Sequence, residues 1–300
     1  MPEKVISLAP AVDQRQAPVP TEQDFQTDTV TIPVKLCNLP PFHSVAGQVL
    51  ALTADPDVDL KHLASVVEAD PAFAAEVLLL ANSSLFGFTS RMHVLRHAIA
   101  ILGIDRIKAV AVTVAMRAFL GKGGPEIEAS WRHSIASAVV AEAISPVFDF
   151  AGDRAYTAAL MHDIGRLGLL KSYKAEVAPV LAAEYQSMDD VLRAERAAVN
   201  VDHGLAGAWL VKNWALPESF HEICQRHHEP LRPEDSPLLQ LVKVSCRMAD
   251  TLGFSAVRCR TGAGYRDLIH DLPAHLPRRM FPAQETLLTA LAERMAAFEA

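Results

Sequence analysis

From His43 onward the sequence consists of short amphipathic segments of the kind that form helices, with almost no strand signal. Apolar residues recur at intervals of three and four, which places them on one face of a helix. No alternation of apolar and polar residues runs longer than four positions, and the strand–helix–strand punctuation of a parallel sheet is absent. Half of the residues are hydrophobic, so such helices can bury a large common core. The sequence therefore predicts an all-α fold.

Local signals place several of the expected helices. Asp70 followed by Pro71 indicates a helix start, because Asp accepts hydrogen bonds from the free amides of the first turn and Pro fits the first helical position. Asn82 ends that helix, and we expect it to be a structural C-cap in the left-handed conformation. An apolar stripe predicts another helix near residues 45–52. Further helices are expected at residues 105–120, 128–146, 154–171, 188–197, 202–214, 217–228, 236–252 and 284–298.

The clearest internal boundary is the segment at residues 121–125, which holds three glycines and one proline. It separates a helical lobe at 35–122 from a second lobe at 126–255, and a helical extension follows at 256–300. Seven of the 19 prolines lie in the first 41 residues, and no helical periodicity is visible up to residue 34. We therefore expect residues 1–34 to form a disordered or loosely packed leader.

Charge and cysteine content exclude several classes of protein. The 28 basic and 35 acidic side chains give a net charge of −7, the wrong sign for binding nucleic acid through bulk charge. The four cysteines form no CxxC pair, which argues against a zinc knuckle and a disulfide framework. No signal peptide and no apolar stretch of 18 residues is visible. We expect a cytoplasmic protein with neither nucleic acid nor a membrane as partner.

The candidate functional residues are histidines and aspartates from several expected helices. Imidazole and carboxylate groups bind divalent metal ions, and this set contains no thiolate. Each residue could instead be a hydrogen-bonded structural residue, since spacing alone does not show that they converge. Neighbouring helix residues point about 100° apart, so His162 and Asp163 can ligate one ion or bridge two only if other helices close around them. The candidate ligands are His133, His162, Asp163, His203, His227, His228 and Asp250.

The order and spacing of His133, the pair His162-Asp163 and Asp250 resemble the H…HD…D signature of the HD superfamily of metal-dependent phosphohydrolases. The string from His162 to Arg166, HDIGR, is similar to the HDIGK string of the HD-GYP branch. This resemblance implies one or two divalent ions, Fe, Mn or Zn. In an enzyme, it implies catalytic roles for Asp163 and Arg166, with Arg166 facing a phosphate of the ligand.

The first lobe narrows the resemblance to the HDOD domain, the HD-related output domain of bacterial signalling proteins. The strings that carry it are Leu39-Pro40-Pro41-Phe42, Asp55-Pro56, Asp70-Pro71, Leu80-Ala81-Asn82-Ser83 and Ala98-Ile99-Ala100-Ile101-Leu102-Gly103. It covers about residues 35–255 and implies a multi-helix fold of two lobes, the second one HD-like. The sequence departs from the phosphodiesterase branch, because no Gly-Tyr-Pro follows His228 and Glu229.

Two functions remain open at this point. HDOD proteins are generally regulatory modules, so the resemblance implies signal transduction through contacts with partner proteins, with or without a bound metal ion. The retained HD residues imply the alternative, a divalent-metal phosphohydrolase or phosphodiesterase. The aromatic segment at residues 85–88 is a candidate partner surface, although packing between the lobes is the alternative reading.

Overall fold

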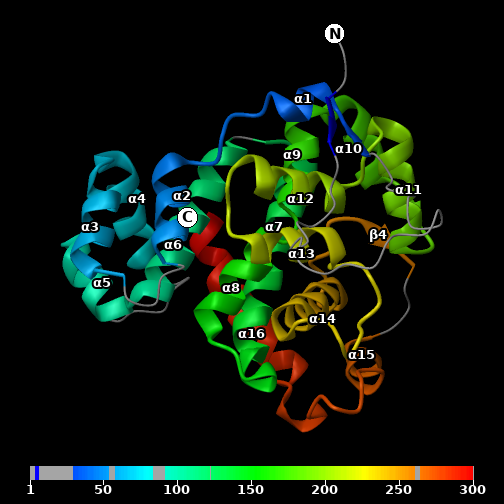
Figure 1. The fold of residues 1–300 in the computed structure, drawn as a ribbon. Coiled ribbons are helices and arrows are strands. Elements are labelled where there is room, and N and C mark those ends of the chain that lie inside the picture. Colours follow the sequence, from blue (N-terminus) through cyan, green and yellow to red (C-terminus); the bar gives the residue numbers. More distant parts are fainter. Residues whose placement is uncertain are drawn as a thin grey trace, which may run out of the picture.

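The computed structural model describes residues 4–6, 30–53, 58–83, 92–121, 123–260 and 264–299. Regular structure within them is almost entirely helical, which confirms the predicted all-α fold (Figure 1). Strands β1 (Lys4–Ile6) and β2 (Val30–Ile32) pair antiparallel, and β3 (Glu184–Tyr185) and β4 (Arg258–Cys259) pair parallel. The first pair lies in the segment expected to be loose, where the β-branched Val30 and Ile32 favour an extended chain.

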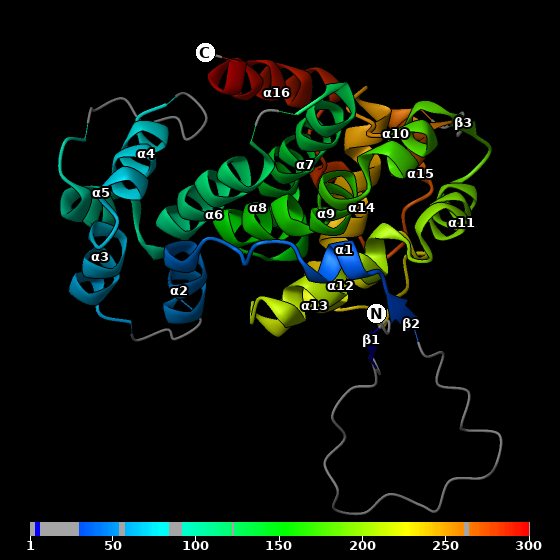
Figure 2. The ribbon, with the colours of Figure 1, turned by 90° about the horizontal axis from the view of Figure 1, so that it is seen from above.

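The first group of helices stands at one end of the molecule (Figures 1 and 2). It comprises α2 (Ser44–Leu52), α3 (Leu60–Glu68), α4 (Pro71–Ala81), α5 (Leu95–Leu102) and α6 (Ile104–Leu120), whereas the short α1 (Val34–Cys37) packs against α9 (Ile164–Ser172) of the larger body. The Asp70 carboxylate accepts hydrogen bonds from the amides of Ala72 and Phe73, each at 3.1 Å, as the predicted helix start requires. Helix α6 packs against α2, α4 and α5 and also against α8, so it joins the two groups of helices.

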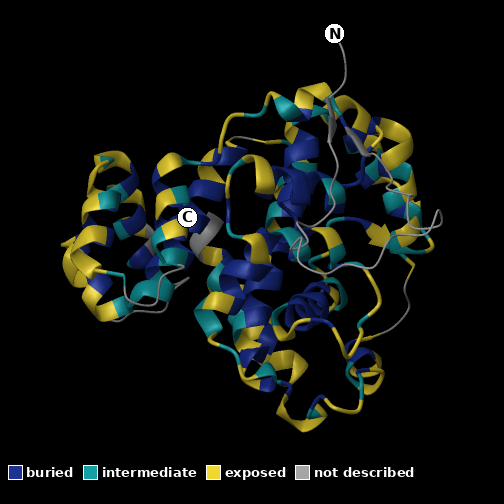
Figure 3. Ribbon diagram, viewed as in Figure 1, coloured by how far each residue is buried: buried dark blue, intermediate teal, exposed yellow. Residues whose placement is uncertain are grey.

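The second group forms the larger body. It comprises α7 (Pro125–Ile144), α8 (Gly152–Met161), α9 (Ile164–Ser172), α10 (Lys174–Ala182), α11 (Met188–Val199), α12 (His203–Asn213), α13 (Glu218–Arg226), α14 (Pro237–Thr251), α15 (Tyr265–His270) and α16 (Gln284–Glu299), with short 3₁₀ turns at Ser145–Phe148 and Arg278–Met280. Helices α7, α8, α9, α12 and α14 pack on one another and are buried along most of their length (Figure 3).

Two sequence predictions about this body need correction. The single helix expected at residues 154–171 is two helices, α8 and α9, which are broken at His162 and Asp163. Asp163 has φ −104° and ψ 18°, outside helical geometry, and both side chains of the pair are fully buried. The break therefore allows two neighbouring residues to point into the same interior. Helices α10 and α15 were not expected from the sequence.

Asn82 has the structural role expected of it, but its backbone does not have the expected conformation. The non-glycine residues with positive φ in the described part of the chain are Asp149, Asn200 and Ala215. Asn82 instead uses its side chain: Nδ2 donates to the carbonyls of Leu78 and Met92, each at 2.8 Å, and Oδ1 accepts from the Met92 amide at 2.7 Å. The amide thus connects the end of α4 to Met92. The candidate partner surface at 85–88 lies outside the described residues.

Helix α16 is held to the body by partly buried ion pairs. The carboxylate of Glu142 on α7 forms two ion pairs. Its Oε1 lies 2.9 Å from Nη1 of Arg106 on α6, and its Oε2 lies 2.6 Å from Nη1 of Arg294 on α16. Leu287 and Leu291 of α16 are buried against the same body. One carboxylate therefore connects α6, α7 and α16, and Figure 2 shows α16 lying against α7.

Helices α9 and α12 touch backbone to backbone at Gly165 and Gly207. A Cβ on Gly165 would lie 2.0 Å from the carbonyl oxygen of His203 and 2.3 Å from the amide nitrogen of Gly207. Such distances are impossible for real atoms, so only glycine at 165 permits this approach. The contact brings the first residue of α12, His203, beside Asp163.

We predict that Gly165→Ala lowers the free energy of unfolding by about 3 kcal/mol, because the added methyl forces two packed helix backbones apart. The control is Gly47→Ala in α2, where a Cβ meets nothing within 4 Å. That change should raise the free energy of unfolding by about 0.5–1 kcal/mol, since alanine favours the helix. Denaturant unfolding of the three proteins measures both. Equal stabilities for Gly165→Ala and the wild type would contradict the backbone contact.

Candidate metal centre

The predicted ligands come from five places in the chain and meet in the interior of the larger body. His133 lies on α7, His162 and Asp163 at the junction of α8 and α9, and His203 at the start of α12. His227 and His228 follow α13, and Asp250 lies near the end of α14. The side chains form two groups, in each of which the ligand atoms lie within 4.8 Å of one another. We call them the Asp163 cluster (Asp163, His203, His227, His228) and the His133 cluster (His133, His162, Cys246).

The outer ring nitrogens of four histidines are occupied by acceptors. His133 Nδ1 lies 2.9 Å from the Phe254 carbonyl, and His162 Nδ1 contacts that of Ala159. His227 Nδ1 lies 2.9 Å from the Cys224 carbonyl, and His203 Nδ1 lies 2.6 Å from Glu195 Oε2. In a neutral ring each Nδ1 therefore carries the proton, and Nε2 presents a lone pair. This is the usual arrangement for metal-binding histidines, whose second nitrogen donates to a carbonyl or a carboxylate.

The inward-facing atoms are acceptors without donors. Asp163 Oδ1, His227 Nε2 and His228 Nε2 are buried and form no hydrogen bond with any residue that the structure describes. Asp163 Oδ1 lies 3.4 Å from His203 Nε2 and 3.6 Å from His227 Nε2. In the His133 cluster, the Nε2 atoms of His133 and His162 face each other at 3.3 Å. Facing lone pairs in a buried site are unfavourable unless a cation lies between them. The donor set therefore fits a divalent ion.

Buried charges surround these acceptors. Arg166 Nε donates to Asp163 Oδ2 at 2.8 Å, and both side chains are nearly or fully buried. Burial alone would raise the pKa of Asp163, but the Arg166 guanidinium and neighbouring histidines hold it well below its usual range. Burial also opposes ionisation of Glu195, whose pKa is nevertheless lowered by His203 and Arg166. Two buried carboxylates thus share one guanidinium, and the remaining negative charge favours a cation.

Three of the imidazoles, those of His162, His227 and His228, stay neutral in this setting. Burial lowers the pKa of His162 and of His228 well below the usual value, and it lowers that of His227 in the same direction. Metal ions bind the neutral ring. These three side chains are therefore ready to act as ligands at neutral pH without first losing a proton.

Sequence patterns did not identify Cys246 and Glu195 as residues of the centre. They also predicted a ligand role for Asp250, which lies in neither cluster. Cys246 Sγ lies 3.5 Å from His133 Nε2, so the structure places a thiol beside a ligand set that the sequence analysis gave without sulfur. Cys246 precedes Asp250 by four residues on α14, a spacing that places both on one helix face and could have identified it. Glu195 had no comparable local signal. Asp250 Oδ1 lies 3.4 Å from Nδ1 of His133, on the outer side of that ring, so its ligand role stays a prediction.

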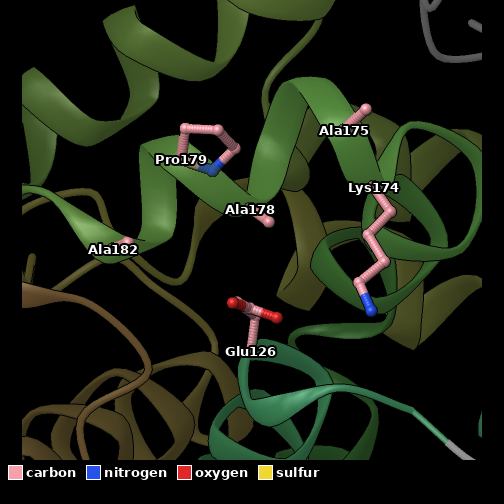
Figure 4. Close-up of a pocket in the computed structure, with 6 residues that line it drawn as sticks. All are labelled: Glu126, Lys174, Ala175, Ala178, Pro179 and Ala182. Atoms are coloured by element: carbon pink, nitrogen blue, oxygen red, sulfur yellow. The ribbon is translucent and has the colours of Figure 1, made fainter.

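The centre is closed to solvent on most sides. His162, Asp163 and His203 have no exposed surface, and His133 and His227 are 3% and 2% exposed. Asp250, with 30% of its side chain exposed, lies at the more open edge. A groove of about 590 Å³ between α7 and α10 lies elsewhere, lined by Glu126, Lys174 and small residues of α10 (Figure 4). None of the predicted ligands lines that groove.

A buried ion pair holds the loop that follows His227 and His228. Lys243 Nζ of α14 donates to Asp235 Oδ2 at 2.7 Å and to the Pro230 carbonyl at 3.1 Å. Arg226 Nη2 reaches the other oxygen of Asp235, also at 2.7 Å. Lys243 and Asp235 are almost fully buried. The pair anchors the connection between α13 and α14 and so fixes the two histidines at its start.

Comparison with known families identifies the family of the chain. The family model for the HDOD domain matches residues 39–230, which is more than half of the chain. The chain belongs to the HDOD family. In this HDOD protein the match runs from α2 through His227 and His228, and helix α14, with Cys246 and Asp250, follows after its end.

Solved structures share the fold at low sequence identity. An HDOD domain protein of unknown function from Geobacter sulfurreducens is 21% identical, with a TM-score of 0.59 over 87% of this chain and 88% of its own. A Shewanella amazonensis protein proposed to be a phosphohydrolase is 17% identical, with a TM-score of 0.61 over 87% and 94%. A Marinobacter aquaeolei protein proposed to act in signal transduction is 21% identical, with a TM-score of 0.63 over 86% and 59%.

Among curated proteins, an uncharacterized protein of Treponema pallidum is 24% identical over 237 residues. The alignment covers 75% of this chain but only 45% of that protein, so the chain spans less than half the length of this relative. Within the described residues, no helix is both long and apolar enough to cross a membrane.

We predict that Lys243→Ala lowers the free energy of unfolding by about 3 kcal/mol, because it removes the buried positive charge beside Oδ2 of Asp235 and leaves that oxygen only the amide of Arg232. The control is Lys212→Ala, which removes an exposed lysine of α12 and should change the free energy of unfolding by less than about 0.5 kcal/mol. Urea unfolding measures both values. If the two lysine variants lose stability equally, Lys243 does not anchor the loop.

Proposed function

We propose that this HDOD protein is a regulatory output module of bacterial signal transduction, which acts by binding partner proteins. Its HD-like lobe holds a divalent ion, Fe, Mn or Zn, in a closed centre that supports the fold and does not turn over substrate. The observation that carries this proposal is the burial of the ligands, since His162, Asp163 and His203 have no exposed surface.

Closed and open metal centres have different functions. A structural ion is surrounded by protein ligands, whereas a catalytic ion keeps a position for water or substrate. In this chain the candidate ligands come from α7, the α8–α9 junction, α12, the end of α13 and α14. An ion held in either cluster connects three of these parts of the larger body. The bound and free forms would therefore differ in stability across that body, which suits a module that presents a surface to partners.

Metal content is the first test. We predict that protein purified without chelator or nickel resin contains near-stoichiometric Fe, Mn or Zn by mass spectrometry, and that Asp163→Ala loses it. Chelation should lower the melting temperature of the wild type, because an ion present at 100 times its Kd contributes about 2.7 kcal/mol. The melting temperature of Asp163→Ala should not respond to chelator.

Asp189→Ala serves as the control for this experiment. Asp189 is an aspartate of the first turn of α11, outside both clusters, so its loss should leave the metal content unchanged. Wild-type protein that is free of metal, and that does not take up added Fe, Mn or Zn, would overturn the metal part of the proposal.

A phosphohydrolase is the second candidate, and one atom favours it. Arg166 Nη1 is buried beside Asp163 and forms no hydrogen bond with any described residue, so it is a free donor next to the candidate metal centre. A guanidinium in that position could bind a phosphate oxygen. In this candidate, Asp163 and the histidines would hold the metal, and Arg166 would bind and orient the phosphate. The ion would supply a polarised water for attack on phosphorus.

Hydrolysis of bis(p-nitrophenyl) phosphate by the metal-loaded protein separates the two functions. The regulatory proposal predicts a rate equal to that of Asp163→Ala, because a buried centre admits no diester. Hydrolysis above this baseline that disappears in Asp163→Ala would favour the enzyme and contradict the closed centre. Heat-inactivated protein with the same metal controls for hydrolysis by free ions.

A further inference from the structure

The two oxygens of Asp163 have different surroundings. Oδ1 faces the Asp163 cluster, at 3.4 Å from His203 Nε2 and 3.6 Å from His227 Nε2. Oδ2 accepts a hydrogen bond from Arg166 Nε at 2.8 Å. One oxygen is thus directed at the ring nitrogens, and the other is already bound to a cation of the protein.

Arg166 is held firmly in this position. It is 2% exposed, and Nη2 lies 3.0 Å from Nε2 and 3.5 Å from Nδ1 of His203. A donor in line with the Nε2 lone pair would be much farther from Nδ1 than from Nε2, so Nη2 lies over the face of the ring. The guanidinium therefore leaves the His203 lone pair free for the cluster while it keeps Oδ2 of Asp163 occupied.

A pair of metal ions in these two clusters would need a shared anion. The clusters are adjacent, with ring centroids of His162 and His227 4.9 Å apart. Two divalent ions held about 3.5–4 Å apart repel strongly and are normally clamped by bridging oxygen ligands. Asp163 is the one carboxylate in the two clusters that the structure describes. To bridge, it would have to give up the bond between Oδ2 and Arg166.

We propose that Arg166 makes Asp163 a ligand for one ion only, so that the centre holds a single ion, in the Asp163 cluster. This inference rests on the proposed function, which supplies the bound ion, and it decides between the one and two ions that the sequence leaves open. Arg166 is a positioning residue: it fixes the orientation of the carboxylate and adds positive charge where a second ion would lie. With one divalent ion present, the positive charge of the ion and Arg166 already exceeds the negative charge of Asp163 and Glu195.

Mn²⁺ is the probe for the test, on the full chain. Equilibrium binding should saturate at one Mn²⁺ per wild-type chain, and the electron paramagnetic resonance spectrum should show the six lines of an isolated ion. Arg166→Gln removes the charge and releases Oδ2. That variant should bind two Mn²⁺ and show an exchange-coupled spectrum. Arg106→Gln, which alters a buried arginine ion pair outside both clusters, should still bind one.

The outcomes are separable. Two Mn²⁺ in the wild type, coupled or not, would overturn this inference and leave the proposed metal centre standing. An Arg166→Gln protein that folds and still saturates at one ion would overturn the role of Arg166. No Mn²⁺, Fe or Zn in any variant would overturn the proposed metal centre itself. If Arg166→Gln does not fold, the stoichiometry and spectrum of the wild type still decide between one ion and two.

Discussion

Helices α9 and α12 approach until their backbones touch at Gly165 and Gly207, and the candidate metal centre lies beside this contact. Asp163 precedes α9 and His203 begins α12, so the short distance between the helices becomes a short distance between a carboxylate and an imidazole. Glu195 then receives both the amide and the ring of His203, at 2.9 and 2.6 Å, and so ties α11 to the same point. A larger residue at 165 would separate all three elements.

The interior of this protein contains charges that are stable only in combination. Asp163, Glu195 and Arg166 would each be expensive to bury alone, since a lone charge in a protein interior costs several kcal/mol. Arg166 pairs with Asp163, and His203 links Arg166 to Glu195. The neighbouring histidines are kept neutral by burial, and their lone pairs add to the negative potential. The whole arrangement has the negative potential of a cation site, even though the guanidinium of Arg166 is already part of it.

Local spacing revealed most of the helices, and the resemblance to the HD superfamily supported the candidate ligands. Asp70 and Pro71 start a helix as expected, and the seven candidate ligands lie within one region of the larger body. Features that depend on how distant parts of the chain pack together could not be predicted from the sequence. The break between α8 and α9 places His162 and Asp163 in one interior, where a continuous helix would have turned them apart. Cys246 lies in the centre because it is one helical turn before Asp250 on α14. Glu195 lies there because α11 packs so that its carboxylate contacts His203.

The separation of the ligands along the chain has a consequence for how the protein acquires its structure. His133 and Cys246 are 113 positions apart, and Arg166 and His203 are 37 apart. Contacts between such distant residues form only after the intervening chain has lost much of its freedom. We therefore expect the contacts of the centre to form late in folding. An ion that binds at that stage would mainly lower the unfolding rate. It would therefore lengthen the lifetime of the folded protein far more than it speeds folding.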